Sequence, residues 1–319
     1  TGYCSLDRFR IHPTNTDELA YTFAQDSTVP AGEGFSKSAK VSITTAENSV
    51  ADNELFRILH RIEGQNMQRA SWGTSGAKPL TLSFFVRSNV TGTYAVEFRM
   101  NAGGNNSLSK NYTINSADTW ERKTITFPKN TSTNFINDNT EGCELGWYLA
   151  AGANYTSGSL ASDYGANAQN TRAAGQTANL ASSNSNTWYI TGVQLEVGDK
   201  ATPFEHRSFG EELALCQRYY TEIQKASGQA VSASTIQLCG VFPTEMRATP
   251  SASLNGALTI WQLTIAGSKG QSSSNIGVNS NINSASVFNA ECANFSSLTQ
   301  HQGVAVAGGD QPLNFDAEL

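Results

Sequence analysis

The segment that decides the fold is ITGVQLEVGDKATPFEHRSFGEELALCQRYY, residues 190–220. From Thr187 to Val197, apolar and polar residues alternate with the period of two that is typical of a half-buried strand. Gly198 and Asp199 then give a turn. The pattern from Ser208 to Glu211 is a capping box, which predicts a short helix from Glu211 to Gln217. The segment therefore predicts that one domain ends in a strand near residue 197 and that a second domain follows the helix.

Short strands recur along the first two thirds of the chain. Their predicted ranges are 39–43, 56–62, 80–88, 92–100, 120–127, 144–151 and 187–197. Polar turns separate them, and Thr91-Gly92-Thr93 has the composition of a hairpin turn. Helical periodicity is nearly absent. This pattern predicts an all-β fold whose first domain, residues 1–207, is a jelly-roll β-sandwich rather than a set of parallel βαβ units.

The helical linker comprises residues 208–220. The sequence after it predicts a second and smaller all-β domain over residues 221–319. Expected strands are 219–225, 235–242, 258–265, 285–292 and 313–315, with a Gly-, Ser- and Asn-rich loop over residues 267–283. The length of about 100 residues is ordinary for a domain. Because its apolar content is modest, we expect this domain to complete its core by packing against copies of itself.

Composition limits the possible partners. Hydrophobic residues make up 39% of the chain, but charged residues only 15%, compared with roughly 25% in ordinary soluble domains. The net charge is −6 and the pI is about 5.3, and no run of Lys or Arg exceeds two. A nucleic-acid partner is therefore not expected. No apolar run approaches the roughly 20 residues that span a bilayer, so membrane insertion is not expected either.

The sequence contains no local motif for catalysis, cofactor binding or metal binding. The four histidines lie in unrelated segments, and no P-loop, dinucleotide fingerprint or nucleophile elbow occurs. The five cysteines are widely spaced without a C-x-x-C pair, so we expect buried thiols and neither zinc nor a disulfide framework. We therefore predict no enzymatic activity and no cofactor. Glycosidase carboxylates leave no local motif; the carboxylates on predicted strands are interpreted as outward-facing positions: Glu97, Glu121, Glu144 and Glu196.

Binding of a sugar is the more plausible role for the aromatic residues. Trp147 and Tyr148 are adjacent on a predicted strand, so they point to opposite faces, and one should face outward if the other is buried. Tyr155 follows in residues 154–185, a polar, Gly- and Ala-rich stretch that predicts a long surface loop. Such a loop is either a ligand rim, a subunit contact or a plain insertion. Our hypothesis is a sugar-facing patch of Trp147, Tyr148 and Tyr155.

Several segments resemble virion proteins of tailed bacteriophages, particularly marine and cyanobacterial ones. The most specific is the 190–220 block, with GVQLEVGDKATPFEHR followed by EELALCQRYY. Similar matches are LDRFR at 6–10, LTLSFFVRS at 80–88, DTWERKT at 118–124, VFPTEMRATP at 241–250 and DAEL at 316–319. The resemblance implies a jelly roll like a carbohydrate-binding module, reduced cysteines, a homotrimer, other virion proteins as partners and location in the virion.

The same resemblance implies a role and a metal. The expected role is a tail fibre or appendage that contacts host-surface glycans; a capsid decoration protein and a secreted carbohydrate-binding module remain alternatives. Many carbohydrate-binding jelly rolls hold a structural calcium near their first and last strands. Asp7 and Glu196 are on the matching strands, although no Asp-dense loop accompanies them.

Overall fold

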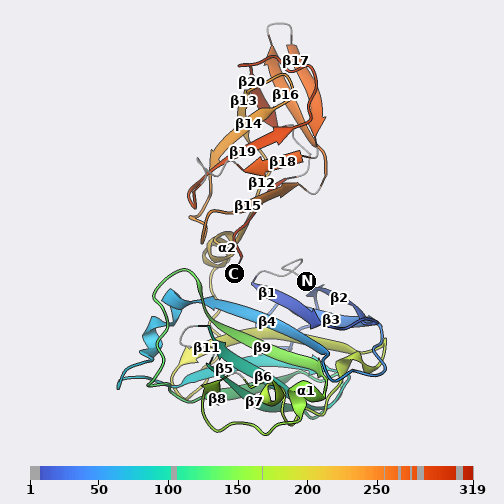
Figure 1. Cartoon of the computed structure of the whole chain (residues 1–319), viewed down its shortest axis with the longest axis vertical. Coiled ribbons are helices and arrows are strands. Elements are labelled where there is room, and N and C mark those ends of the chain that lie inside the picture. The colour runs from blue at the N-terminus through green and yellow to red at the C-terminus, as the bar shows by residue number, and fades with distance from the viewer. Residues whose placement is uncertain are drawn as a thin grey trace. The chain divides into compact units, whose positions relative to one another are not determined.

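The structure is a computed structural model of the 319-residue chain and describes residues 8–101, 106–166, 168–254, 256–264, 267–273, 275–278, 284–306 and 312–318. The fold is all-β, and every strand pair is antiparallel (Figure 1). The chain divides into two compact units, the first ending at His206 and the second running from Arg207 to Glu318. The linking helix lies within the second unit.

The first unit is a sandwich of two sheets. The six-stranded sheet has the order β1 (Phe9–Thr14), β4 (Leu55–Glu63), β9 (Glu141–Ala151), β6 (Gly92–Met100), β7 (Asn106–Ile114) and β10 (Gly165–Ala166). The five-stranded sheet has the order β2 (Ala20–Asp26), β3 (Ser38–Thr45), β11 (Thr187–Val197), β5 (Leu80–Ser88) and β8 (Glu121–Phe127). Because the chain repeatedly crosses between the sheets, the predicted jelly-roll sandwich is confirmed, with all seven predicted strands present.

Alternate residues of both sheets fill the space between them. Trp147, Trp188, Phe84 and Phe98 are fully buried there, and the rings of Phe84 and Trp147 meet edge to face at 5.8 Å. Burying side chains of this size contributes about 1.5–3 kcal/mol each. Short helical turns lie in the connections between the strands: η1 (Gly64–Ala70), α1 (Ala153–Thr156), η2 (Gln169–Thr171) and η3 (Leu180–Ser182).

The predicted hairpin at Thr91-Gly92-Thr93 is wrong. β5 belongs to the five-stranded sheet and β6 to the six-stranded sheet, so the turn carries the chain from one layer to the other. Both strands are strongly apolar, and each sends its apolar face into the shared core instead of pairing with the other. Gly92 has a φ of 128°, which favours glycine at this crossing.

The predicted surface loop over residues 154–185 is also different in the structure. Residues 153–158 and 168–177 pack on the outer face of the six-stranded sheet, and we call them the covering segment. Ser109 Oγ donates to Arg172 O at 2.7 Å, and Asn111 Nδ2 donates to Ala174 O at 3.1 Å. Tyr155 and Ala173 of the segment are buried against the sheet. Because many residues of the segment are small, its backbone can lie close to the sheet. The composition that suggested a surface loop therefore serves packing.

The second unit also consists of two sheets. A three-stranded sheet has the order β12 (Tyr220–Ile223), β21 (Leu313–Asp316) and β15 (Ser251–Leu254). A seven-stranded sheet has the order β17 (Gly267–Ser273), β16 (Leu258–Thr264), β20 (Gly303–Val306), β13 (Ser227–Ala230), β14 (Ile236–Val241), β19 (Val287–Ala293) and β18 (Asn275–Val278). The five predicted strands are confirmed.

The expectation of a loop over residues 267–283 is wrong for the part of this range that the structure describes. β17 and β18 lie there, one at each edge of the seven-stranded sheet. Edge strands are held by backbone hydrogen bonds to a single neighbour and need little apolar sequence, which explains why the Gly- and Ser-rich pattern concealed them.

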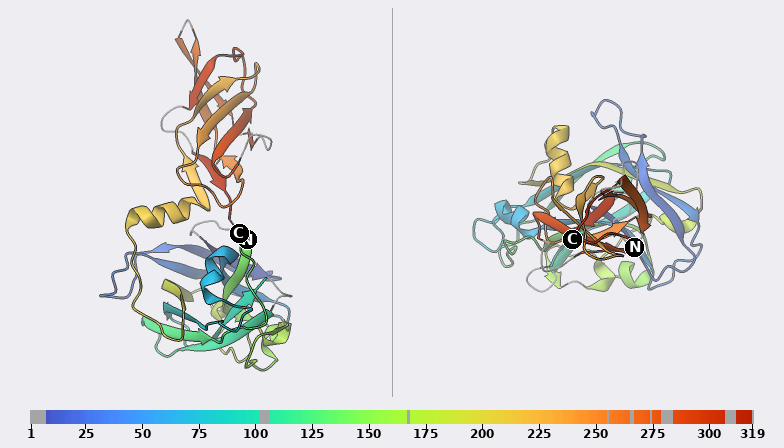
Figure 2. Two further views of the ribbon diagram at one scale, coloured as in Figure 1. Left: turned by 90° about the vertical axis from the view of Figure 1, so that its left-hand side faces the viewer. Right: turned by 90° about the horizontal axis from the view of Figure 1, so that it is seen from above.

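The predicted helix is α2 (Phe209–Gln217), coloured gold in Figure 2. Its capping box is confirmed, since Ser208 Oγ accepts from Glu211 N at 3.4 Å and Glu211 Oε2 accepts from Ser208 N at 3.1 Å. The helix contains no buried residue. Within the described part of the chain, no helix combines the length and the apolar character needed to cross a membrane.

None of the four described cysteines is in a disulfide. Cys143 and Cys292 are buried as expected, Cys216 is half-buried and Cys239 is exposed. Burial raises the pKa of the Cys143 thiol well above its usual value. Cys4 lies outside the described residues.

Candidate functional site

Charged side chains gather on the outer face of the six-stranded sheet. Register sets Arg57 opposite Tyr148, Arg61 opposite Glu144 and Glu144 opposite Arg99. Directly opposite residues project to the same side of a sheet. We call this group the charged face; with the neighbours that it contacts, it consists of Arg57, Arg61, Glu97, Arg99, Glu141, Glu144, Tyr148 and Arg172.

The inner part of the charged face is centred on Glu97, which is 1% exposed. Tyr148 Oη donates to Glu97 Oε2 at 2.6 Å, and Arg172 Nη2 donates to the same oxygen at 2.9 Å. Arg57 Nη1 lies 3.6 Å from it. Burial alone would raise the pKa of Glu97, but Arg172 and the Tyr148 hydroxyl more than offset this, so the pKa is lowered. Arg172 belongs to the covering segment, and this ion pair therefore fastens the segment to the sheet.

The outer part is built around Glu144, which is 1% exposed and meets three guanidinium groups. Its oxygens lie 3.3 Å from Arg57 Nη1, 3.1 Å from Arg61 Nε and 3.2 Å from Arg99 Nη2. Glu141 Oε2 lies 3.0 Å from Arg61 Nε. Burial, partly offset by Arg61, raises the pKa of Glu141.

Three of these side chains are the most exposed. The exposed fractions are 19% for Arg61, 20% for Arg99 and 14% for Glu141. We call these three residues the recognition rim. Arg99 Nε and Glu141 Oε1 are buried atoms that form no hydrogen bond within the described structure. The parts of these guanidinium and carboxylate groups that reach solvent can offer hydrogen bonds to a ligand.

The aromatic patch predicted from the sequence is not exposed. Trp147 and Tyr148 are 0% exposed and Tyr155 is 6% exposed. The two neighbours do point to opposite faces, Trp147 into the core and Tyr148 outward, but Tyr148 then packs with Tyr155 and Ala173. The expectation that one of the pair meets solvent is wrong because the covering segment lies over the outer face.

The carboxylates expected at outward-facing positions of half-buried strands differ in exposure, and two of the four are buried on the outer face of their sheet. Glu97 and Glu144 are buried, whereas Glu121 and Glu196 are partly exposed. Burial raises the pKa of Glu121, but Lys123 and the amides of Asn115 and Ser116 lower it to about 2. The sequence did contain a signal for the buried Glu97 and Glu144. Arg57 and Arg61 on one strand, and Glu97 and Arg99 on another, are an even number of positions apart and therefore share a face.

The predicted calcium pair gains no support from Glu196. Thr202 Oγ1 donates to Glu196 Oε1 at 2.6 Å and Thr202 N donates to Oε2 at 3.0 Å, so both oxygens are already engaged. Asp7 lies outside the described residues, and calcium at this pair stays a prediction.

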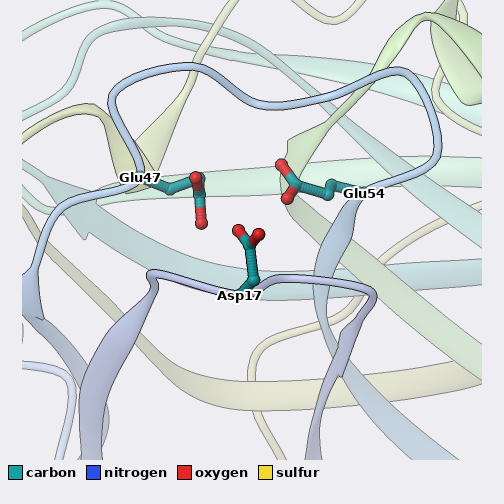
Figure 3. A group of neighbouring side chains, drawn as sticks. All are labelled: Asp17, Glu47 and Glu54. Carbon is teal, nitrogen blue, oxygen red and sulfur yellow. The ribbon is translucent and has the colours of Figure 1, made fainter.

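A different acidic group lies in the loops that join β1 to β2 and β3 to β4. The carboxylates of Asp17, Glu47 and Glu54 point toward one another (Figure 3), and their oxygens lie within 4.8 Å. Carboxylate oxygens are ligands that calcium prefers. Each glutamate is also held by backbone, Glu47 Oε2 by Glu18 N at 3.2 Å and Glu54 Oε2 by Ala51 N at 2.6 Å. The sequence did not reveal this group because three separate loop positions form it.

No protein-family profile matches the sequence, and no curated protein matches it either. Among solved structures, the enzymatically active domain of tailspike protein 4 of bacteriophage CBA120 aligns over 60% of this chain and 19% of its own, with 13% identity and a TM-score of 0.33. A family 11 carbohydrate-binding module of Clostridium thermocellum aligns over 64% of this chain and 92% of its own, with 10% identity and a TM-score of 0.31. Tandem family 22 modules of Paenibacillus barcinonensis Xyn10C align over 97% and 93%, with 6% identity and a TM-score of 0.27.

Proposed function

We propose that this chain is a non-enzymatic glycan-binding protein of a bacteriophage virion, a tail fibre or appendage component that contacts host-surface glycans. The observation that carries the binding role is the recognition rim. Arg61, Arg99 and Glu141 present planar donors and an acceptor side by side where their side chains reach solvent, with Arg61 Nε 3.0 Å and Arg99 Nη2 3.8 Å from the Glu141 oxygens. Sugar hydroxyls both donate and accept, so adjacent guanidinium and carboxylate groups can bind a pair of them.

The charged face is poorly suited to glycoside hydrolysis. A hydrolase needs one protonated carboxyl as general acid and a second carboxylate within reach of the sugar. The pKa of Glu97 is lowered, and its oxygens are occupied by Tyr148 and Arg172. Glu144 is 1% exposed and surrounded by three arginines. The arrangement favours recognition through the rim over bond cleavage.

The virion role rests on the sequence resemblance of residues 190–220 and on the two-unit architecture. The division between His206 and Arg207 falls inside that block. We further propose that the chain assembles as a homotrimer and contacts other virion proteins. Light scattering at micromolar concentration tests the assembly: three times the chain mass of 34.1 kDa is expected, and a monomer mass contradicts it.

Immunogold labelling of intact phage particles with an antibody to this chain tests the location. Gold on the tail or its fibres is expected. Gold over the head would make the chain a capsid decoration protein. The absence of label, together with secretion of the chain, would favour the secreted carbohydrate-binding module.

A further inference from the structure

The outer face of the seven-stranded sheet carries an exposed tryptophan. Trp261 on β16 is 46% exposed, whereas Trp72, Trp147 and Trp188 are each 3% exposed or less. An indole left in water forgoes the free energy that burial would give. Its ring is therefore available to a ligand.

The neighbours of Trp261 leave its ring open. In the register of the sheet, Gly270 on β17 and Ala305 on β20 lie directly opposite Trp261, one on each side. Ser227 on β13 lies opposite Ala305. Directly opposite residues share one face of the sheet. Because glycine, alanine and serine are small, a low strip of sheet surface extends from the indole across two further strands.

Two amide side chains border this strip. Gln229 on β13 is exposed and lies opposite Gln237 on β14, which is half-buried. Neither amide hydrogen-bonds to another residue in the described part of the chain. With adjacent strands about 4.8 Å apart, β13 is about 10 Å from β16. An aromatic ring and two unpartnered amides thus border the same small-residue strip.

The character of this face favours a small neutral ligand over a protein. Val241 and Val287 are exposed, but β14 and β19 lie three and four strands from β16. The apolar surface is therefore not contiguous with Trp261, unlike the apolar core of a protein interface. On β13, β14, β16, β19 and β20 the only charged residue is Glu291, which lies four strands from Trp261 and directly opposite Gln237. A neutral pyranose combines an apolar ring face with hydroxyl edges and matches this surface.

We propose that Trp261, Ser227, Gln229, Gln237 and Ala305 form a second glycan subsite that takes a short neutral oligosaccharide. One pyranose stacks on the indole, and the sugars beside it hydrogen-bond to the amides on β13 and β14, about 10 and 14 Å away. This inference rests on the proposed glycan-binding function and extends it to the second unit. The subsite is independent of the recognition rim, which lies in the first unit.

The test measures binding of the full-length chain to an array of neutral gluco-, galacto-, manno- and N-acetylglucosamine oligosaccharides. Trp261→Ala is expected to lower affinity for at least one of them by about tenfold or more. Trp261→Phe keeps an aromatic ring and should retain most of the affinity. Arg69→Ala, at an exposed position outside both proposed sites, is the control and should leave the affinity unchanged. Circular dichroism confirms that each variant is folded.

Other outcomes separate this subsite from the proposed function. If Arg99→Ala abolishes all glycan binding while Trp261→Ala changes none, the second subsite is wrong and the rim stands. If the wild-type chain binds no neutral glycan but binds charged ones through the rim, the subsite is likewise wrong. A change of assembly mass in Trp261→Ala, measured by light scattering, would assign Trp261 to a subunit contact and overturn the inference.

Discussion

Replacing Arg172 by alanine tests whether the covering segment is fastened to the sheet by a buried ion pair. Arg172 is 12% exposed and Glu97 1% exposed, and they are joined by hydrogen bonds of 2.9 and 3.2 Å. Removing one partner of a buried pair costs about 3–5 kcal/mol, because the other charge stays buried. Arg57 and Tyr148 still contact Glu97, so we expect about 3 kcal/mol, at the lower end.

For a unit of about 200 residues, a loss of about 3 kcal/mol corresponds to a decrease in Tm of about 6–12 °C. Differential scanning calorimetry on the full chain measures it. Arg69→Ala is the matched control, since Arg69 is exposed and should change Tm by less than about 2 °C. The double variant Glu97→Gln with Arg172→Ala should be more stable than Arg172→Ala alone. Equal Tm values for Arg172→Ala and Arg69→Ala would refute the reasoning.

Three further predictions concern packing, pH and thiol access. Gly142→Ala would press its Cβ against the backbone of Gly64 and should lower the free energy of unfolding in urea by about 3 kcal/mol; Gly165→Ala, with open space around it, is the control. Burial and the charge of Arg8 lower the pKa of His60 to about 3. Stability should therefore fall as pH decreases below the unfolded value near 6.5, by about 1–2 kcal/mol between pH 7 and pH 5; urea titrations in which His60→Gln shows the same fall would contradict this. A thiol reagent should modify exposed Cys239 before buried Cys143 and Cys292; mass spectrometry showing Cys143 labelled first would count against the structure.

The strands that could be predicted were those whose alternation is visible locally. β5, β6, β9 and β11 carry apolar side chains toward the core, and short-range pattern is sufficient to find them. β7 was not found: its sequence NSLSKNYTI is polar, yet it pairs with β6 along almost its whole length. Its stability as a strand comes from a neighbour and from the covering segment, neither of which a local pattern contains.

The candidate site was less predictable than the fold because it depends on register between distant strands. Arg57 and Glu144 are 87 positions apart, and only the pairing of β4 with β9 brings them together. The alternation argument correctly separated Trp147 from Tyr148 onto two faces. It could not reveal that a Gly- and Ala-rich segment would cover one of those faces.

The most direct measurement for the central claim is binding of the full-length chain to a microarray of bacterial surface glycans, comparing the wild type with the double variant Arg99→Ala and Glu141→Gln. We predict saturable binding of the wild type to at least one glycan, loss of that binding in the double variant, and its retention in Arg69→Ala. A folded wild-type chain that binds no glycan on the array, or a double variant that binds as tightly as the wild type, would contradict the assignment of glycan recognition to the rim.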